Sequence, residues 1–212
     1  MAISKMPTIT RIQQQKAANR ANIYLDGKFA FGITLEVLLK YHLDLNKEIS
    51  EETIKVLKDE DIEEKIYARA VNFSTIRPRS EKEIRDWFKR KKVPEEIIEV
   101  VSKRLKNLNL VDDLNFAKWW IEQRATFRPK SKRFIQFELR KKGIKNEIIQ
   151  ELLSEWGSEN EESIALSLAT KRHRRLAHLP VEEQRKKLTA FLAARGFSWS
   201  EVKKVIDQIV EK

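Results

Sequence analysis

Nine basic residues lie between Arg124 and Lys145, against a single acidic residue, Glu138. This basic run carries a net charge of +8, most of the +11 of the whole chain. Lysine and arginine at such density attract anionic groups of a nucleic acid, an acidic protein surface or a lipid headgroup. The run predicts a partner-binding surface whose candidate residues are Arg124, Arg128, Lys130, Lys132, Arg133, Arg140, Lys141 and Lys145, with the aromatic Phe137.

The residues favour other chemistries much less. The chain has no cysteine, which removes disulfides, thiolate metal sites and cysteine nucleophiles. His173 and His178 lie in or beside a basic run rather than beside carboxylates, as a metal site would require. Asp112 and Asp113 precede an amphipathic segment, where an N-cap and a negative first turn are expected. We therefore expect no catalytic residue, no cofactor and no metal, and we do not expect an enzyme.

The sequence around the basic run recurs along the chain. Residues 77–105 align on residues 128–156 without a gap at a shift of 51, and eight of these 29 positions are identical. A fainter third copy, residues 188–206, aligns at a shift of 53. Self-similarity at such a period is typical of tandem repeats whose units pack neighbour on neighbour.

Each copy carries the same start and stop signals for a middle helix. Ser80 and Ser131 are N-cap residues, each placed two residues after a proline. Gly143 and Gly196 stand where the chain turns left-handed after the helix, and Lys92 takes that place in the first copy at a cost of roughly 1 kcal/mol. The flanking helices are predicted over 61–73, 113–126 and 159–178, and from near Pro94, near Lys145 and at the capping box Ser198 to Glu201.

A different pattern precedes the repeats. Residues 8–33 alternate between apolar and polar side chains, and Asp26-Gly27 supplies the signal of a tight hairpin turn. The sequence predicts a small meander that packs on a helix capped by Thr34, with a second helix after Ser50. The candidates for its apolar face are Ile23, Leu25, Phe29 and Phe31.

Together these patterns predict a mainly α fold in which tandem three-helix repeats form an elongated, curved module after a small N-terminal β-hairpin or meander with helices. The expected domains are 1–60 for this head, 61–111 and 112–157 for the first two repeats, and 158–212 for the third. An apolar content of 41% with 35% charged residues indicates a soluble globular chain. We expect a cytoplasmic monomer that does not associate with a membrane.

The first two copies differ at the start of the middle helix. Glu81 and Glu83 suit the positive end of a helix, whereas Lys132 and Phe134 hold those places in the second copy. Each misplaced charge costs about 0.3–1 kcal/mol, so the arrangement favours a role in binding an anionic partner.

Aromatic residues raise a separate question. Phe116, Trp119, Trp120, Ile121 and Trp156 fall at helical spacings and are expected to pack within or between repeats. Phe137 lies on the opposite side of its helix from the apolar face, and its counterpart in the first copy is Asp86. Packing between repeats and contact with a partner both remain open for Phe137.

The repeated pattern RPxSxxxIxxxxxxK(K/G)(V/I)xxEII, with the segment LNLVDDLNFAKWWIEQR between its copies, resembles the RecX family of bacterial recombination regulators. The most specific part is the run Leu110 through Asp113, Phe116-Ala117, Arg124, Pro129-Lys130-Ser131, Leu139 and Lys142-Gly143-Ile144. The resemblance is closest over 61–157.

The resemblance implies three-helix repeats that bind the RecA recombinase, lie in the groove of its filament on single-stranded DNA, and modulate filament assembly, ATP hydrolysis and strand exchange. It implies no enzymatic activity and transfers no catalytic residue. An independent DNA-binding module that contacts the phosphate backbone is the alternative, and a scaffold for another acidic protein is a third possibility. The segment KNEIIQELLSEW has one lysine and three glutamates, which disfavours it as a major-groove recognition helix.

Overall fold

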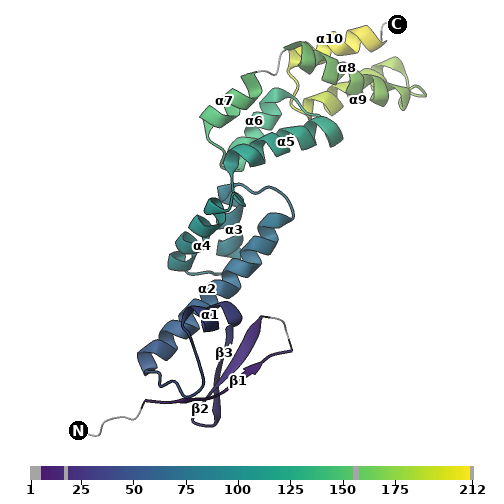
Figure 1. Cartoon of the computed structure of the whole chain (residues 1–212). Coiled ribbons are helices and arrows are strands. Elements are labelled where there is room, and N and C mark those ends of the chain that lie inside the picture. Colours follow the sequence, from purple (N-terminus) through teal and green to yellow (C-terminus); the bar gives the residue numbers. More distant parts are fainter. Residues whose placement is uncertain (1–5, 17–18, 155–157, 211–212) are drawn as a thin grey trace. The chain divides into compact units, whose positions relative to one another are not determined.

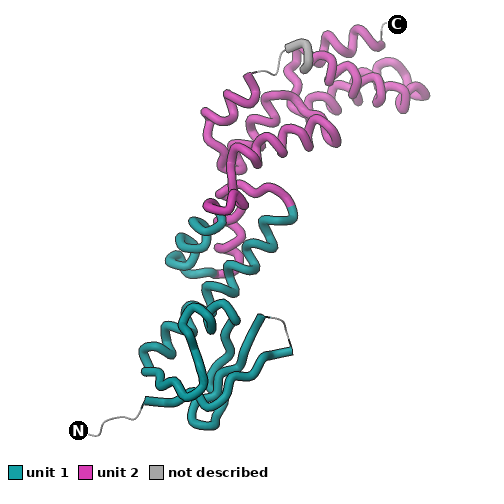
Figure 2. The backbone as a smooth tube through the Cα atoms, viewed as in Figure 1, with its two compact units in different colours: residues 1–76, 93–105 teal, residues 77–92, 106–212 magenta. Residues whose placement is uncertain are grey.

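The computed structural model describes residues 6–16, 19–154 and 158–210 and forms two compact units. One unit comprises the residues up to Ile76 together with Val93–Leu105, and the other comprises Arg77–Lys92 and the residues from Lys106 onward (Figure 2). Helices make up most of both units, and one three-stranded antiparallel sheet lies near the N-terminus (Figure 1). The mainly α fold with a small N-terminal sheet is therefore confirmed.

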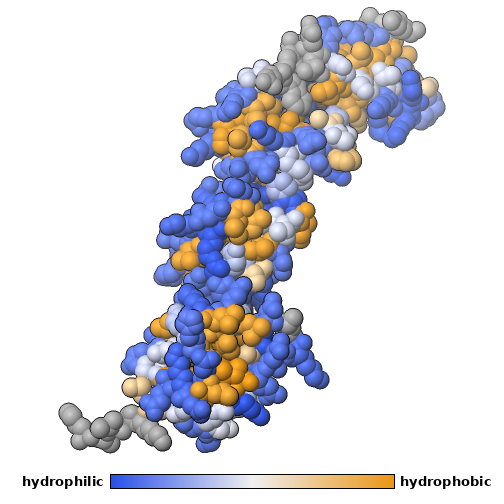
Figure 3. All heavy atoms as spheres, in the orientation of Figure 1, coloured by the Kyte–Doolittle hydropathy of each residue, from blue (hydrophilic) through white to orange (hydrophobic). Residues whose placement is uncertain are grey.

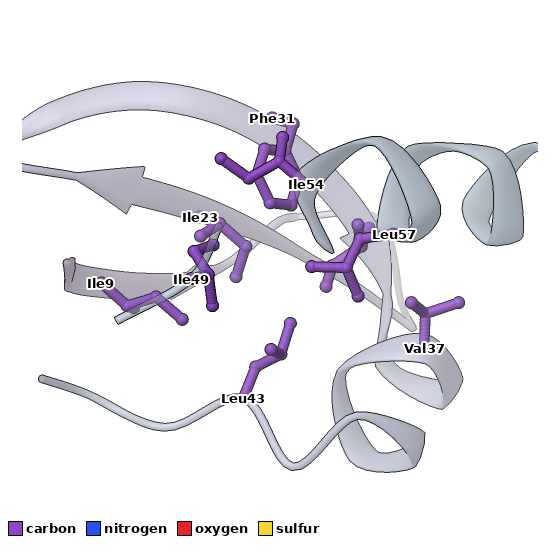
Figure 4. Packing of buried hydrophobic residues seen from close by; sticks show 9 residues of the cluster. Ile9, Ile23, Phe31, Val37, Leu43, Ile49, Ile54 and Leu57 are labelled. Carbon is purple, nitrogen blue, oxygen red and sulfur yellow. The ribbon is translucent and has the colours of Figure 1, made fainter. Parts of the chain in front are cut away.

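The sheet consists of β1 (Ile9–Gln14), β2 (Arg20–Leu25) and β3 (Lys28–Thr34), paired in that order. Asp26 and Gly27 adopt positive φ values of 48° and 80°, as the predicted tight turn between β2 and β3 requires. Thr34 then caps α1 (Leu35–Lys40) by accepting a hydrogen bond from the amide of Val37. A core of buried aliphatic side chains and Phe31 lies between the sheet and the helices, as Figure 4 shows.

The prediction that Phe29 belongs to this core is wrong. Ile23 and Phe31 are buried and Leu25 is partly buried, but 60% of the surface of Phe29 is exposed. On β2 the neighbours Ile23 and Tyr24 pair with Phe31 and Phe29, so β3 carries one extra residue. Such a bulge disrupts the alternation of side chains between the two faces of a sheet, and the extra residue, Ala30, packs against the core.

A single long helix, α2 (Glu51–Thr75), covers the segment where sequence patterns indicated two helices on either side of residue 60. The carboxylate of Asp61 on α2 is buried against the sheet and accepts hydrogen bonds from Arg20 on β2 and from the amide of Thr34. Further along the same unit, Arg104 on α4 (Glu95–Asn107) forms a two-pronged ion pair with Glu64 of α2.

The second unit begins with α3 (Glu81–Arg90) and continues through two complete three-helix groups. The first group consists of α5 (Asp113–Phe127), α6 (Lys132–Lys141) and α7 (Asn146–Ser154), around a core that includes Phe116, Ile135 and Leu139. The second consists of α8 (Ser158–Arg174), α9 (Val181–Ala193) and α10 (Trp199–Val210), around Leu188, Leu192 and Val205. The predicted packing of Trp119 and Trp120 is confirmed, and Trp156 lies outside the described residues.

The predicted start and stop signals are confirmed. Ser80 and Ser131 accept hydrogen bonds from the amides of Glu83 and Phe134 as N-caps, and Glu201 receives a hydrogen bond from the amide of Ser198. Gly143 and Gly196 have φ values of 85° and 89°, and Lys92 has a φ of 55°. No helix in the described part of the chain is both long and apolar enough to cross a membrane. Hydrophilic residues dominate much of the face drawn in Figure 3, with hydrophobic areas between them.

Candidate partner-binding surface

Successive middle helices in the second unit dock onto the next repeat at equivalent positions. The hydroxyl of Ser80 donates to the carbonyl of Lys142 at 2.9 Å, and the amide of Ser131 donates to the carbonyl of Arg195 at 3.0 Å. We call these contacts the first joint, at Ser80, and the second joint, at Ser131. Each joins the N-terminus of one middle helix to the residue before the glycine that ends the next.

Both glycines are needed for space as well as for their left-handed backbone. A Cβ atom on Gly143 would lie 2.7 Å from the Cβ of Lys82 in the first joint. A Cβ atom on Gly196 would lie 2.6 Å from the hydroxyl of Ser131 and 2.7 Å from the Cβ of Phe134 in the second joint. Lys92 belongs to the first repeat, and the described residues before that repeat form the head rather than a three-helix unit, so no such docking contact restricts position 92 in the described part of the chain.

A carboxylate from the following repeat satisfies the first amide of each docked helix. Asp113 accepts a hydrogen bond from the amide of Glu81 at 2.9 Å, and Glu161 accepts one from the amide of Lys132 at 2.8 Å. Burial is the main cause that raises the pKa of Asp113 and of Glu161 above the usual values. The positive end of α6 therefore faces an acidic group that local sequence reasoning could not assign, since Glu161 follows 29 residues later.

A hollow of about 620 Å³ lies where α3, α5 and α6 meet. Two of the predicted binding residues, Phe137 and Lys141, line it from α6, and a third, Arg124, lines it from α5. Phe134 and Phe137 contact edge to face with ring centroids 6.2 Å apart, and 59% of Phe137 is exposed. The other lining residues are Lys82, Glu83, Asp86, Trp120, Glu138 and Lys142.

Most charges in the hollow are already paired. Arg124 donates to both oxygens of Glu138, at 2.6 and 3.0 Å, and its guanidinium lies 4.4 Å from the ring centroid of Trp120. Trp120 also donates to Glu138 at 2.9 Å. These contacts hold Arg124 in the wall of the hollow, and its role in binding a partner stays a prediction.

The remaining predicted residues follow α6 and its two ends. Arg133, Arg140 and Lys141 are exposed on α6, although the Nε of Arg140 donates to Asn146 at 2.9 Å. Lys130 and Lys132 are partly buried, and the Nζ of Lys130 lies 3.5 Å from the centroid of the Phe134 ring. Arg128 and Lys145 are exposed in the segments before and after the helix.

Family models cover most of the chain. The N-terminal domain of regulatory protein RecX matches residues 7–50, and the first, second and third three-helix domains of RecX match 67–105, 112–153 and 159–206. Regulatory protein RecX of Clostridium acetobutylicum is 32% identical over 95% of this chain and 96% of its own length. The chain belongs to the RecX family. Regulatory protein RecX of Bacillus subtilis is likewise 32% identical, over 96% of this chain and 78% of its own length.

Solved structures agree with this assignment to the RecX family. A crystal structure of regulatory protein RecX superimposes with a TM-score of 0.74 at 31% identity, covering 95% of this chain and all of that one. The crystal structure of RecX from Lactobacillus salivarius, at 24% identity and a TM-score of 0.58, supports the fold over 71% of this chain. The predicted family resemblance is therefore confirmed.

Sequence reasoning on this RecX-family chain missed Lys82, Phe134 and Lys142 as parts of the surface. Lys142 is identical to Lys91 in the aligned repeats, and its Nζ pairs with Glu83 across the first joint. The repeat alignment could have drawn attention to Phe134, because this aromatic residue takes the place of Glu83.

Proposed function

We propose that this protein binds the RecA recombinase and its filament on single-stranded DNA and modulates filament assembly, ATP hydrolysis and strand exchange, lowering all three. Membership of a family whose members are named as regulatory proteins supports a regulatory role. We further propose that α6 and the adjoining hollow contact the filament. The observation that carries this location is the exposure of Phe137 beside the cation of Lys141.

An exposed aromatic side chain next to a hollow is the kind of anchor that concentrates binding energy in protein interfaces. Phe137 projects from a helix whose buried face already holds Ile135 and Leu139, so the fold of the repeat does not require an aromatic residue there. In the first repeat Asp86 takes its place and pairs with Lys82. The repeat therefore tolerates a polar residue at this position.

Steady-state ATP hydrolysis by RecA on single-stranded DNA tests the proposal, with the purified protein added at a stoichiometric ratio. We expect the wild-type protein to lower the rate and Phe137→Ala to require about tenfold more protein for the same effect, as loss of an aromatic anchor predicts. Lys141→Glu is expected to act in the same direction. Arg90→Glu is the matched control because Arg90 is exposed at the equivalent place on α3.

The proposal fails if the wild-type protein leaves both ATP hydrolysis and strand exchange unchanged. Equal effects of Phe137→Ala, Lys141→Glu and Arg90→Glu would move the contact surface away from α6. Titration of single-stranded and duplex DNA without RecA separates the DNA-binding alternative, whose sign would be tight binding that weakens steeply as salt rises.

A further inference from the structure

The two joints contain equivalent residues with different charges. In the first joint Glu83 is surrounded by three cations. Arg77 donates to its two oxygens at 2.8 and 3.1 Å, Lys142 donates to it at 2.5 Å, and Arg79 lies 3.9 Å away. Hydrogen bonds and charges of Arg77 and Lys142 outweigh burial and leave the pKa of Glu83 below its usual value. In the first joint, the cations therefore bind a carboxylate that the chain itself supplies, that of Glu83.

The second joint keeps the cations and lacks the carboxylate. The repeat alignment places Arg128 on Arg77 and Lys130 on Arg79, and the shift of 53 places Arg195 on Lys142. Phe134 stands in the place of Glu83. Within the described part of the chain, Arg128, Lys130 and Arg195 form no ion pair with an acidic residue.

A fourth cation adjoins this group. The ring of Phe191 on α9 has the guanidinium carbon of Arg195 at 3.6 Å from its centroid and that of Arg172 at 5.7 Å. The Nε of Arg172 is buried and has no hydrogen-bond partner among the described residues. A buried donor without a partner is unfavourable, and a ligand that satisfies it would relieve that cost.

The nearest acidic groups are already engaged. Glu138 accepts from Arg124 and Trp120, and Glu161 accepts from the amide of Lys132. Burial lowers the pKa of Lys130. The charge of Glu138 opposes this effect, and the charges of Arg124, Arg195 and Arg128 add to it. Burial and the charge of Arg172 likewise lower the pKa of Arg195. The cations of the second joint therefore repel one another, and the carboxylate whose charge acts on Lys130, that of Glu138, is already paired with Arg124.

We infer that the second joint binds a carboxylate of a partner protein, an aspartate or glutamate side chain in an acidic segment, between Arg128, Lys130 and Arg195. The first joint supports a carboxylate rather than another anion, because the equivalent cations there hold the carboxylate of Glu83. The inference deepens the proposed function by giving the chemistry of the partner segment, and it rests on that function only for the partner's identity.

The surroundings also suit an apolar residue beside the acidic one. Phe134 belongs both to the second joint and to the wall of the hollow, where it contacts the exposed Phe137. A segment whose carboxylate reaches Arg195 could therefore lay an adjacent apolar side chain over these two rings. Acidic and apolar residues in alternation are the pattern that fits this surface.

Fluorescence anisotropy of a dye-labelled synthetic peptide of alternating glutamate and leucine tests the inference on the full chain without RecA. We expect the peptide to bind the wild-type protein. Phe134→Glu would supply the missing carboxylate from within, as Glu83 does in the first joint, and should weaken peptide binding about tenfold or more. Arg195→Gln should weaken it in the same direction because it removes one of the cations.

The matched control is Gln136→Glu, which makes the same change in net charge on the same helix but outside the lining of the hollow. Retained binding in Gln136→Glu, with a thermal midpoint of Phe134→Glu no lower than that of the wild type, supports the inference. Equal binding by Phe134→Glu and wild type overturns it, as does an equal loss in Gln136→Glu. A labelled single-stranded oligonucleotide that binds through these residues when the peptide does not would also overturn it, in favour of a phosphate ligand.

Discussion

The hydroxyl of Ser80 reaches the carbonyl of Lys142, 62 residues further along the chain, and this contact ties the first joint together. The same serine caps its own helix by accepting a hydrogen bond from the amide of Glu83. A residue that local patterns identify as an N-cap therefore also links two repeats. Replacing it would affect both the helix start and the docking of the next repeat.

The glycines of the two joints are the first sites for a stability test. Gly143→Ala and Gly196→Ala should each lower the free energy of unfolding by about 1–2 kcal/mol from left-handed strain alone. Both should cost more than that, because a Cβ on Gly143 would meet Lys82 at less than 3 Å and a Cβ on Gly196 would meet both Ser131 and Phe134. Urea unfolding followed by circular dichroism measures the effect.

Lys92→Gly is the internal control for this prediction. It relieves a left-handed lysine at a position with a φ of 55°, and we expect the free energy of unfolding to rise by up to about 1 kcal/mol. If Gly196→Ala proved as stable as the wild-type protein, the close docking in the second joint would be incorrect.

Substitution of Asp61, the buried acidic residue of the N-terminal head, should strongly lower the free energy of unfolding. Asp61 has only 5% of its side chain exposed and holds Arg20, Lys65 and the amide of Thr34. Asp61→Asn is expected to lower the free energy of unfolding by about 3 kcal/mol, because it leaves the partly buried Arg20 without its counter-charge. The control is Lys40→Ala, which removes an exposed ion pair with Glu60 and should lower the free energy of unfolding by less than about 1 kcal/mol. Urea unfolding measures both variants.

Acid pH should weaken the first joint through Glu83. The pKa of Glu83 lies below its usual value of 4.5 in the folded protein. A carboxylate with a lowered folded-state pKa stabilises the fold above its unfolded-state pKa, and that stability is lost as the pH falls through the folded value. Thermal scans from neutral pH to below 4.5 should therefore show a smaller loss of stability for Glu83→Gln than for the wild type.

Asp113 and Glu161 act in the opposite direction, since burial raises the pKa of both. Their charged forms cost stability above the raised values, and protonation relieves that cost as the pH falls. Comparison of Asp113→Asn with Glu83→Gln over the same pH range would distinguish the two groups. A steeper acid loss in Glu83→Gln than in the wild type would contradict the lowered pKa.

The start of α6 allows a binding test that does not sacrifice the fold. Lys132→Glu/Arg133→Glu places acidic residues in the first turn, where the helix dipole favours negative charge by about 0.3–1 kcal/mol per residue. We expect weaker inhibition of ATP hydrolysis by RecA with the helical circular dichroism retained, and a thermal midpoint that reflects the opposing effects of the helix dipole and of repulsion from Glu161. Lys186→Glu/Lys187→Glu, an exposed pair on the middle helix of the third repeat, is the control. Unaltered inhibition in the α6 variant would exclude this end of the helix from the contact surface.

Local sequence rules were enough to predict where helices begin and end and where the hairpin turns. N-caps at Ser80 and Ser131, left-handed residues at Gly143 and Gly196, and the turn at Asp26-Gly27 each depend on a few neighbouring residues. The repeat alignment then supplied the three-helix grouping. Features that depend on partners distant in sequence were not accessible, such as the capture of Arg124 by Glu138 or the capping of Lys132 by Glu161.

The outward position of Phe29 had a different cause. Its alternation with Phe31 placed both on one face, and the bulge at Ala30 that breaks the alternation leaves no clear mark in the sequence. Two cations of the second joint, Arg128 and Lys130, belong to the basic run that the sequence singled out, whereas Arg195 requires the joint itself to be known. Arg195 lies in the third repeat, far from the basic run, and only the equivalence with Lys142 relates it to that run.

Lys92 marks a boundary for how this chain could have grown. A further three-helix unit inserted before the first repeat would have to bring the start of its middle helix against position 92, where the equivalent glycines leave no room for a Cβ atom. With a lysine there, such a unit could not dock as its neighbours do. Position 92 therefore suits a repeat that follows the N-terminal head, whereas Gly143 and Gly196 suit repeats that follow another three-helix unit.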